Sequence, residues 1–231
     1  KQTDELLPEV IIKEMGFGTL EEALVKIHNP TPEEFYNADR FTPLKRLVAE
    51  ELIANQLALR RIKKTTQSNP AQALVRNTLI KALVGRLPFT LTHSQERVVN
   101  EIKEDLKKPR PMMRLLQGDV GSGKTVVAAL AMSIAADKET QSVLMAPTEL
   151  LAEQHLDNLR GWYEPLGVKT VLLKSNLTQK EKGLILSDIK NGEASIIVGT
   201  HALFQKKVEY KNLSLVIVDE QHRFGVDQRL S

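Results

Sequence analysis

The sequence predicts an α/β domain in which helices flank a parallel sheet, preceded by a helical segment. Short apolar runs are the first observation, and they fall at residues 113–116, 142–145, 170–173, 195–198 and 215–218. More than a dozen residues with a helical pattern separate consecutive runs, which is enough chain for the crossover connections between parallel strands. The last run, "LVIV", lacks polar alternation, as expected of a strand covered on both faces.

The first 87 residues carry a helical rather than a strand-like pattern. A turn at residues 29–32 interrupts it, because each proline biases its predecessor away from helix. Within "TPLKRLVAEELIANQLALRRIKK", Leu44, Leu47 and Leu52 recur at helical spacing, which predicts a long amphipathic helix. A second helix in "AQALVRNTLIKALVGRL" should end near Gly85. We therefore expect a helical linker at 1–87 and the α/β domain at 88–231.

Composition excludes several classes of function. With 42% hydrophobic and 26% charged residues among 231, the chain can bury a substantial core. It contains no cysteine, which excludes disulfides and thiolate zinc sites and favours a reducing, cytoplasmic setting. No apolar run approaches the roughly 18 residues that span a bilayer, so we expect no membrane association. A formal net charge of +3 permits nucleic-acid binding, and 4% aromatic residues favour contacts with its backbone over base stacking.

A glycine-rich stretch carries the clearest chemistry. Residues 118–125, "GDVGSGKT", match the phosphate-loop pattern G-x-x-x-x-G-K-[ST] in full, between an apolar run and a helical stretch. Glycines let the backbone N–H groups curl around phosphate oxygens, lysine reaches the β- and γ-phosphates, and the threonine hydroxyl suits Mg²⁺. The alternative is a plain glycine-rich turn. The predicted nucleotide-binding residues are Gly118, Asp119, Val120, Gly121, Ser122, Gly123, Lys124 and Thr125.

An acidic pair supplies the second half of a hydrolytic site. Asp219 directly follows the apolar run 215–218, so it should emerge at the carboxyl edge of the sheet, where ligands of open α/β sheets bind. We expect Asp219 to hold Mg²⁺ together with Thr125. Glu220 is the candidate base for the attacking water, and Lys124 assists catalysis at the phosphates. The alternative is that the acidic pair caps the next helix.

Upstream of the loop, Gln95 allows two interpretations. Thr92 stands three residues before it, which is a capping-box pattern. A carboxamide can also match the donor and acceptor of adenine. Phe89 could likewise stack on a base or lie buried between domains.

The ordered motifs "LPFTLTHSQ", "GDVGSGKT", "APTELLAEQH", "VGTHALF" and "VDEQHRFGV" resemble those of superfamily 2 helicases, and their particular forms resemble the RecG branched-DNA helicases. The resemblance covers most of the chain. It implies a RecA-like P-loop NTPase fold, with Phe89 and Gln95 in the adenine-reading motif. Asp219 and Glu220 would open the DExH box, in which Gln221 and His222 couple nucleotide state to DNA.

The resemblance also implies DNA contacts. Pro147 and Thr148, with Gly199 and Thr200, occupy motifs that contact strand phosphates. In "LLKSNL" the family's glycine-containing turn is absent, which argues against a contact at Ser175. A basic cluster could touch duplex DNA or complement a helix dipole; it comprises Arg60, Arg61, Lys63 and Lys64.

The function implied is that of an ATP-dependent DNA helicase and translocase on branched DNA, in repair and recombination. ATP and Mg²⁺ would be its cofactors, and double-stranded and branched DNA its substrates, in a monomer at the bacterial nucleoid. This chain would hold the first motor domain, while a second motor domain and a wedge belong to the full-length chain; alone it should be weakly active. The alternatives are a transcription-repair coupling factor motor and a nucleotide-gated binding module without hydrolysis.

Overall fold

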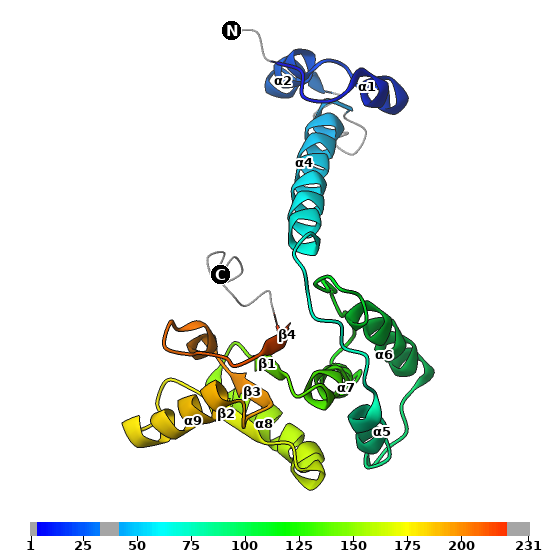
Figure 1. Ribbon diagram of the computed structural model, residues 1–231. Coiled ribbons are helices and arrows are strands. Elements are labelled where there is room, and N and C mark those ends of the chain that lie inside the picture. The colour runs from blue at the N-terminus through cyan, green and yellow to red at the C-terminus, as the bar shows by residue number, and fades with distance from the viewer. Residues whose placement is uncertain (1–3, 33–41, 221–231) are drawn as a thin grey trace. The chain divides into compact units, whose positions relative to one another are not determined.

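The computed structural model describes residues 4–32 and 42–220. They fall into two compact units that divide between Ser68 and Asn69 (Figure 1). In the described ranges, no helix has both the length and the apolar character that crossing a membrane requires.

A buried arginine organises the first unit. Its helices in the described residues are α1 (Glu9–Met15), α2 (Leu20–His28) and α4 (Thr42–Gln67), and α4 confirms the predicted long helix. Arg46 of α4 is fully buried, and its guanidinium pairs with Glu5 at 2.5 Å and with Glu50 at 3.3 Å. A buried cation needs such partners. The cluster therefore holds the segment before α1 against α4.

A four-stranded parallel sheet forms the second unit, in the spatial order β2-β3-β1-β4. Its strands are β1 (Gln141–Met145), β2 (Thr170–Leu173), β3 (Ile196–Gly199) and β4 (Leu213–Val218). Every residue of β1 and β3, the two inner strands, is buried. Four of the five apolar runs are thus strands, and the predicted parallel α/β fold is confirmed.

The remaining apolar run, residues 113–116, is not a strand, so the prediction of a strand there is wrong. Apolar residues form a strand only where a neighbour supplies hydrogen-bond partners, and no described strand pairs with this segment. Met113 and Leu115 are 45% and 70% exposed. Arg114 holds the segment instead, because its guanidinium donates to Glu101 and Asp105 of helix α6 (His93–Leu106) at 2.6 Å each.

The last strand also departs from expectation. Full coverage of both faces was predicted for "LVIV", but Val216 and Val218 are 46% and 41% exposed. The reason is that β4 pairs only with β1 among the described strands, and the core packs against its Leu215 and Ile217 face alone.

Helices cover both faces of the sheet (Figure 1). The helices of this unit are α5 (Thr78–Val84), α6 (His93–Leu106), α7 (Lys124–Asp137), α8 (Glu149–Tyr163) and α9 (Gln179–Asn191), with the short turns η2 (Glu164–Leu166) and η3 (His201–Phe204). Helices α7, α8 and α9 contact the strands, whereas α5 and α6 pack against α7. Side chains alternate along β1: Leu144 belongs to the core on the side of α7 and α8, whereas Val143 and Met145 belong to the core on the side of α9 and η3. The result is a sheet between two helical layers.

The boundary between the two units lies before Pro88, where the predicted α/β domain begins. Leu74, Ile80 and Leu83 belong to the core that includes α7, and the Leu74 N–H donates to the Leu106 carbonyl at 2.8 Å. Residues 69–87 therefore fold with the sheet. The assignment of 1–87 as a linker and 88–231 as a motor domain stays a prediction.

Candidate nucleotide site

The phosphate loop turns into helix α7 at Lys124. Gly121 and Gly123 have φ of 79° and 83°, the left-handed region that side chains rarely adopt. At Gly123 a Cβ would also lie 2.3 Å from the Gln95 amide nitrogen. The backbone conformation thus favours glycine at both positions, and at Gly123 a side chain would also displace the Gln95 amide.

Lys124 closes the loop on itself. Its ammonium donates to the carbonyls of Gly118 and Asp119, at 2.8 Å and 2.9 Å. This places a positive charge at the N-terminal end of α7, which already favours anions. Thr125 follows, partly buried, in the first turn of the helix. A glycine-rich loop at a helix N-terminus, a lysine ammonium and a threonine hydroxyl form the donor set that suits a nucleoside triphosphate with Mg²⁺.

Gln95 connects helix α6 to this loop. Its Oε1 accepts from the Thr92 N–H at 2.9 Å, and the Thr92 hydroxyl accepts from the Gln95 N–H at 3.3 Å, which confirms the capping box. Its Nε2 donates to the Ser122 carbonyl at 3.0 Å. Phe89 is 46% exposed, beside a shallow hollow of about 420 Å³ that Leu87 and Glu96 also line. Adenine recognition by Phe89 and Gln95 stays a prediction.

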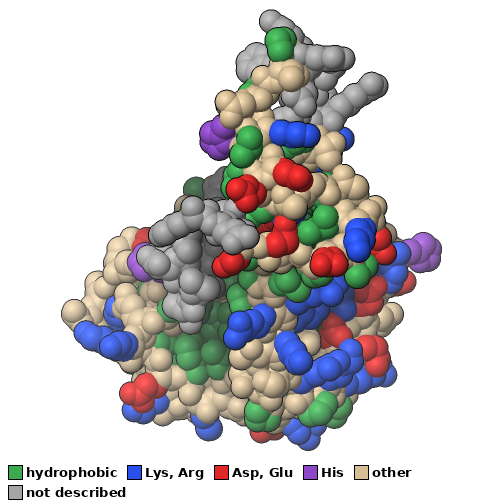
Figure 2. All heavy atoms as spheres, turned by 90° about the horizontal axis from the view of Figure 1, so that it is seen from above, with side chains coloured by type: hydrophobic (Ala, Val, Ile, Leu, Met, Phe, Trp, Pro, Cys, Tyr) green, Lys and Arg blue, Asp and Glu red, His purple; other side chains and the backbone are tan. Residues whose placement is uncertain are grey.

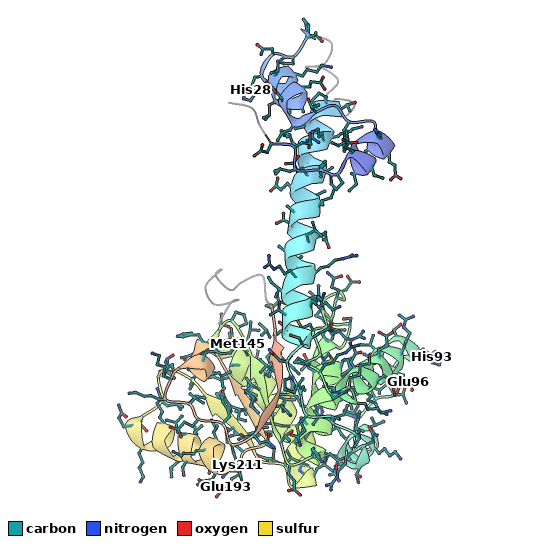
Figure 3. The ribbon with its side chains drawn as sticks, turned by 45° about the horizontal axis from the view of Figure 1, so that its top comes forward. His28, His93, Glu96, Met145, Glu193 and Lys211 are labelled. Atoms are coloured by element: carbon teal, nitrogen blue, oxygen red, sulfur yellow. The ribbon has the colours of Figure 1, made fainter. Side chains whose placement is uncertain are left out.

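Asp219 extends the end of β4. Its N–H donates to the carbonyl of Met145, which Figure 3 labels at the end of β1, at 2.9 Å. Its Oδ2 lies 2.8 Å from His155 Nε2, and its Oδ1 accepts from the Glu220 N–H at 3.0 Å. The His155 hydrogen bond, and to a lesser degree the Lys124 charge, hold the pKa of this carboxyl below its usual range although burial opposes them. Asp219 is therefore ionised near neutral pH.

Glu220 has a constrained backbone. Its φ is 49°, and Glu139 is the other non-glycine residue with a positive φ among those described. Such a conformation costs on the order of 1 kcal/mol or more and often marks functional sites. Gln221 and His222, which the sequence analysis assigned to coupling, lie outside the described residues.

His155 is the contact that the sequence analysis missed. It lies on α8, where the neighbouring Gln154 is exposed, and only 13% of the His155 side chain is exposed. Helical spacing could have found it, because His155 follows the buried Ala152 by three residues and so shares the inward face of the helix.

The predicted DNA-contacting residues follow neighbouring strands at the same edge of the sheet. Thr148 caps α8 by accepting from the Leu151 N–H at 3.3 Å. Gly199 pairs with Met145 in register, and a Cβ there would meet the Leu173 carbonyl at 2.3 Å. Pro147 is partly buried, and the buried Thr200 hydroxyl has no hydrogen-bond partner within the described ranges. Their contact with DNA stays a prediction.

The turn after β2 is occupied by contacts to α8. The Ser175 N–H donates to Glu149 at 3.1 Å, and Lys174 pairs with Glu153 at 2.6 Å. The backbone donor of Ser175 is therefore engaged within the protein. The absence of a DNA contact at Ser175 stays a prediction.

The site fits a magnesium ion held partly by its ligand. Across residues 4–32 and 42–220, no three His, Cys, Asp or Glu side chains gather as a metal site. Mg²⁺ commonly takes one or two carboxylates together with phosphate oxygens and waters. One ionised carboxylate, Asp219, and one hydroxyl, Thr125, match that requirement.

Comparisons with known proteins show one matching family model and several similar relatives. The family model for DEAD/DEAH box helicases matches residues 92–231. The ATP-dependent DNA helicase RecG of Haemophilus influenzae is 48% identical over 92% of this chain, and that of Escherichia coli K12 is 46% identical over 99%. These matches cover 31% and 33% of the relatives, so the chain spans about a third of their length.

Solved structures agree. RecG bound to a three-way DNA junction matches 97% of this chain and 30% of its own, with a TM-score of 0.80 and 38% identity. A yeast DEAD-box splicing factor matches 74% of this chain and 45% of its own, with a TM-score of 0.51 and 16% identity, which shows the fold alone. The predicted RecA-like fold is confirmed.

Proposed function

Because this chain belongs to the DEAD/DEAH box helicase family, we propose that it is the ATP-binding half of a DNA motor acting on branched DNA. The similar relatives are named ATP-dependent DNA helicases, and the structurally similar RecG is bound to a three-way junction. The motor would use ATP hydrolysis to regress replication forks or migrate Holliday junctions in DNA repair and recombination.

The observation that carries this proposal is the pairing of a phosphate loop with an ionised carboxylate. The glycine-rich loop leads into α7 at Lys124, and in the same unit Asp219 follows the end of β4, where its N–H donates to the Met145 carbonyl at 2.9 Å. Such a cation and anion belong together where the phosphates and the metal ion of a nucleotide are held at once.

In this proposal each residue of the site has its own role in binding or hydrolysing the nucleotide. The loop N–H groups and Lys124 bind the phosphates, while Thr125 and Asp219 hold Mg²⁺ directly or through water. When bound, Mg²⁺ would neutralise charge on the phosphate oxygens. Glu220 orients the attacking water and accepts its proton. Phe89 and Gln95 contact the adenine.

Beyond the described residues, Gln221 and His222 would transmit the nucleotide state to DNA. Pro147, Thr148 and Gly199, with Thr200, would face strand phosphates in a sequence-independent manner. Figure 2 shows Lys and Arg side chains interspersed with Asp and Glu, so the visible face is not one broad basic field.

We propose that the other domains of the motor lie in the same full-length chain, because this chain spans about a third of the length of its relatives. In this proposal 1–87 is the linker to a wedge domain and 88–231 is the first motor domain, in a monomer acting in the bacterial cytoplasm. The second motor domain would bring arginines to the γ-phosphate, which are worth about 10³ to 10⁵ in rate in related systems. The chain alone should therefore bind ATP and hydrolyse it slowly.

Titration with a fluorescent ATP analogue, with and without Mg²⁺, tests the site directly. Lys124→Ala removes charge-assisted hydrogen bonds of about 1.5 to 3 kcal/mol, so affinity should fall about 10- to 150-fold. Lys180→Ala, an exposed lysine on α9, is the matched control and should bind as the wild type does. Equal affinity of the Lys124 variant and the wild type would refute the site.

The variant Glu220→Gln in the full-length protein distinguishes a motor that hydrolyses ATP from a nucleotide-gated module that only binds it. If Glu220 is the base, this variant binds nucleotide but loses DNA-stimulated turnover. Retained turnover would show that Glu220 does not have this role.

A further inference from the structure

The carboxylate of Asp219 is held from two sides. Its Oδ1 accepts the N–H of Glu220 at 3.0 Å, and its Oδ2 lies 2.8 Å from His155 Nε2. An ionised carboxylate can only accept, so the Nε2 of His155 carries the hydrogen of this bond. Two of the roughly four acceptor positions of the carboxylate are thereby used, and the others stay available for further ligands.

His155 is itself fixed by a well-anchored helix. Ala152 and Leu156, on either side of it along α8, are buried in the core. Thr148 caps the start of the helix, and Glu153 joins it to the turn after β2 through Lys174 at 2.6 Å. With its side chain 13% exposed, His155 reaches Asp219 from an element that has little freedom to move.

We propose that His155 is a positioning residue, which orients the Asp219 carboxylate for the magnesium ion that accompanies the nucleotide. The inference rests on the proposed function, because it needs Asp219 to act on Mg²⁺. Hydrogen bonds from such neighbours fix the rotamer of a metal-binding carboxylate, and their loss commonly weakens metal affinity about 10- to 100-fold. His155 does not touch the ion in this proposal.

The competing interpretation is a purely structural link between α8 and the end of β4. Such a link would affect the stability of the fold and would alter nucleotide affinity equally with and without metal. A positioning role instead acts on the gain in affinity that Mg²⁺ provides. The two interpretations therefore predict different values for the ratio of nucleotide affinity with Mg²⁺ to nucleotide affinity without it. This ratio can be measured without any turnover.

The experiment compares His155→Leu with His155→Gln, which are similar in size but differ in the ability to donate a hydrogen bond. The affinity of each for a fluorescent ADP analogue is measured in Mg²⁺ and in EDTA, and urea unfolding reports stability. Asn158→Ala, exposed one turn further along α8, is the control.

We expect the wild type and Asn158→Ala to show the same gain from Mg²⁺, and His155→Leu to lose about tenfold or more of it at unchanged affinity in EDTA. His155→Gln should recover part of the gain, even if both His155 variants unfold at lower urea. An equal gain in His155→Leu and the wild type overturns the positioning role alone. If the wild type itself gains nothing from Mg²⁺, the metal role of Asp219 and the positioning role both fail.

Discussion

Replacing Gln95 by glutamate separates the two roles of this side chain. In the wild type its Oε1 accepts from the Thr92 N–H at 2.9 Å, while its Nε2 donates to the Ser122 carbonyl at 3.0 Å. Glutamate keeps the acceptor and loses the donor. It thus preserves the helix cap and removes the contact with the phosphate loop.

The expected magnitudes differ for the two roles. Glutamate is a normal capping-box residue, so the free energy of unfolding of Gln95→Glu should stay within about 0.5 kcal/mol of the wild type. Gln95→Ala also loses the bond to Thr92 and should lose about 1 kcal/mol. In Gln95→Glu, the missing donor and a carboxylate facing the Ser122 carbonyl should weaken ATP binding about tenfold, which is 1.4 kcal/mol.

Competition by inorganic tripolyphosphate completes the assay. If Gln95 supports the phosphate loop, Gln95→Glu weakens ATP and tripolyphosphate alike. If it reads adenine, only ATP binding falls, because tripolyphosphate has no base. Unchanged affinity for both ligands would refute the reasoning and leave Gln95 with its capping role only.

Three further variants test other parts of the structure. Gln141 is buried and makes three hydrogen bonds, to the Ile189 and Ala194 carbonyls and from the Asn212 N–H, so Gln141→Ala should lower the free energy of unfolding by about 3 kcal/mol in urea, against little change in the exposed Gln72→Ala. Hydrogen bonds from Lys108 and Arg114 hold the pKa of Asp105 below its usual range although burial opposes them; this stabilisation is present above the unfolded pKa of about 3.9 and is lost as pH falls through the lower folded value, so Asp105→Asn should flatten the acid loss of stability below about pH 4. Gly123→Ala should distort the phosphate loop at a cost above about 1 kcal/mol and weaken ATP binding, whereas Gly161→Ala on α8, where a Cβ meets nothing within 4 Å, should bind normally.

Local chemistry made much of the site predictable. The phosphate loop is a contiguous pattern, and glycine conformation, lysine reach and helix start all follow from eight adjacent residues. Asp219 could be placed because a carboxylate directly after an apolar strand run must emerge at the strand end. The capping box at Gln95 could likewise be predicted, because Thr92 stands three residues earlier.

What escaped prediction depends on pairing between distant segments. Residues 113–116 have the composition of a strand, but hydrogen-bond partners decide strand formation, and Arg114 ties this segment to α6 instead. His155 was missed because its partner is Asp219, 64 residues away. The boundary at Ser68 depends on Leu74, which is buried in the core of the second unit and whose N–H donates to the Leu106 carbonyl at the end of α6, and composition alone does not reveal this.

The two halves of the site are held by different parts of the fold. The order β3-β1-β4 sets Gly199, Met145 and Asp219 side by side, because the carboxyl ends of parallel strands meet at one edge. The phosphate loop has no such strand support among the described residues: Gln95 joins it to α6, and Arg114 joins the segment before the loop to the same helix. The geometry of phosphate binding should therefore respond to changes in α6, while the acidic half of the site depends on the sheet and on α8.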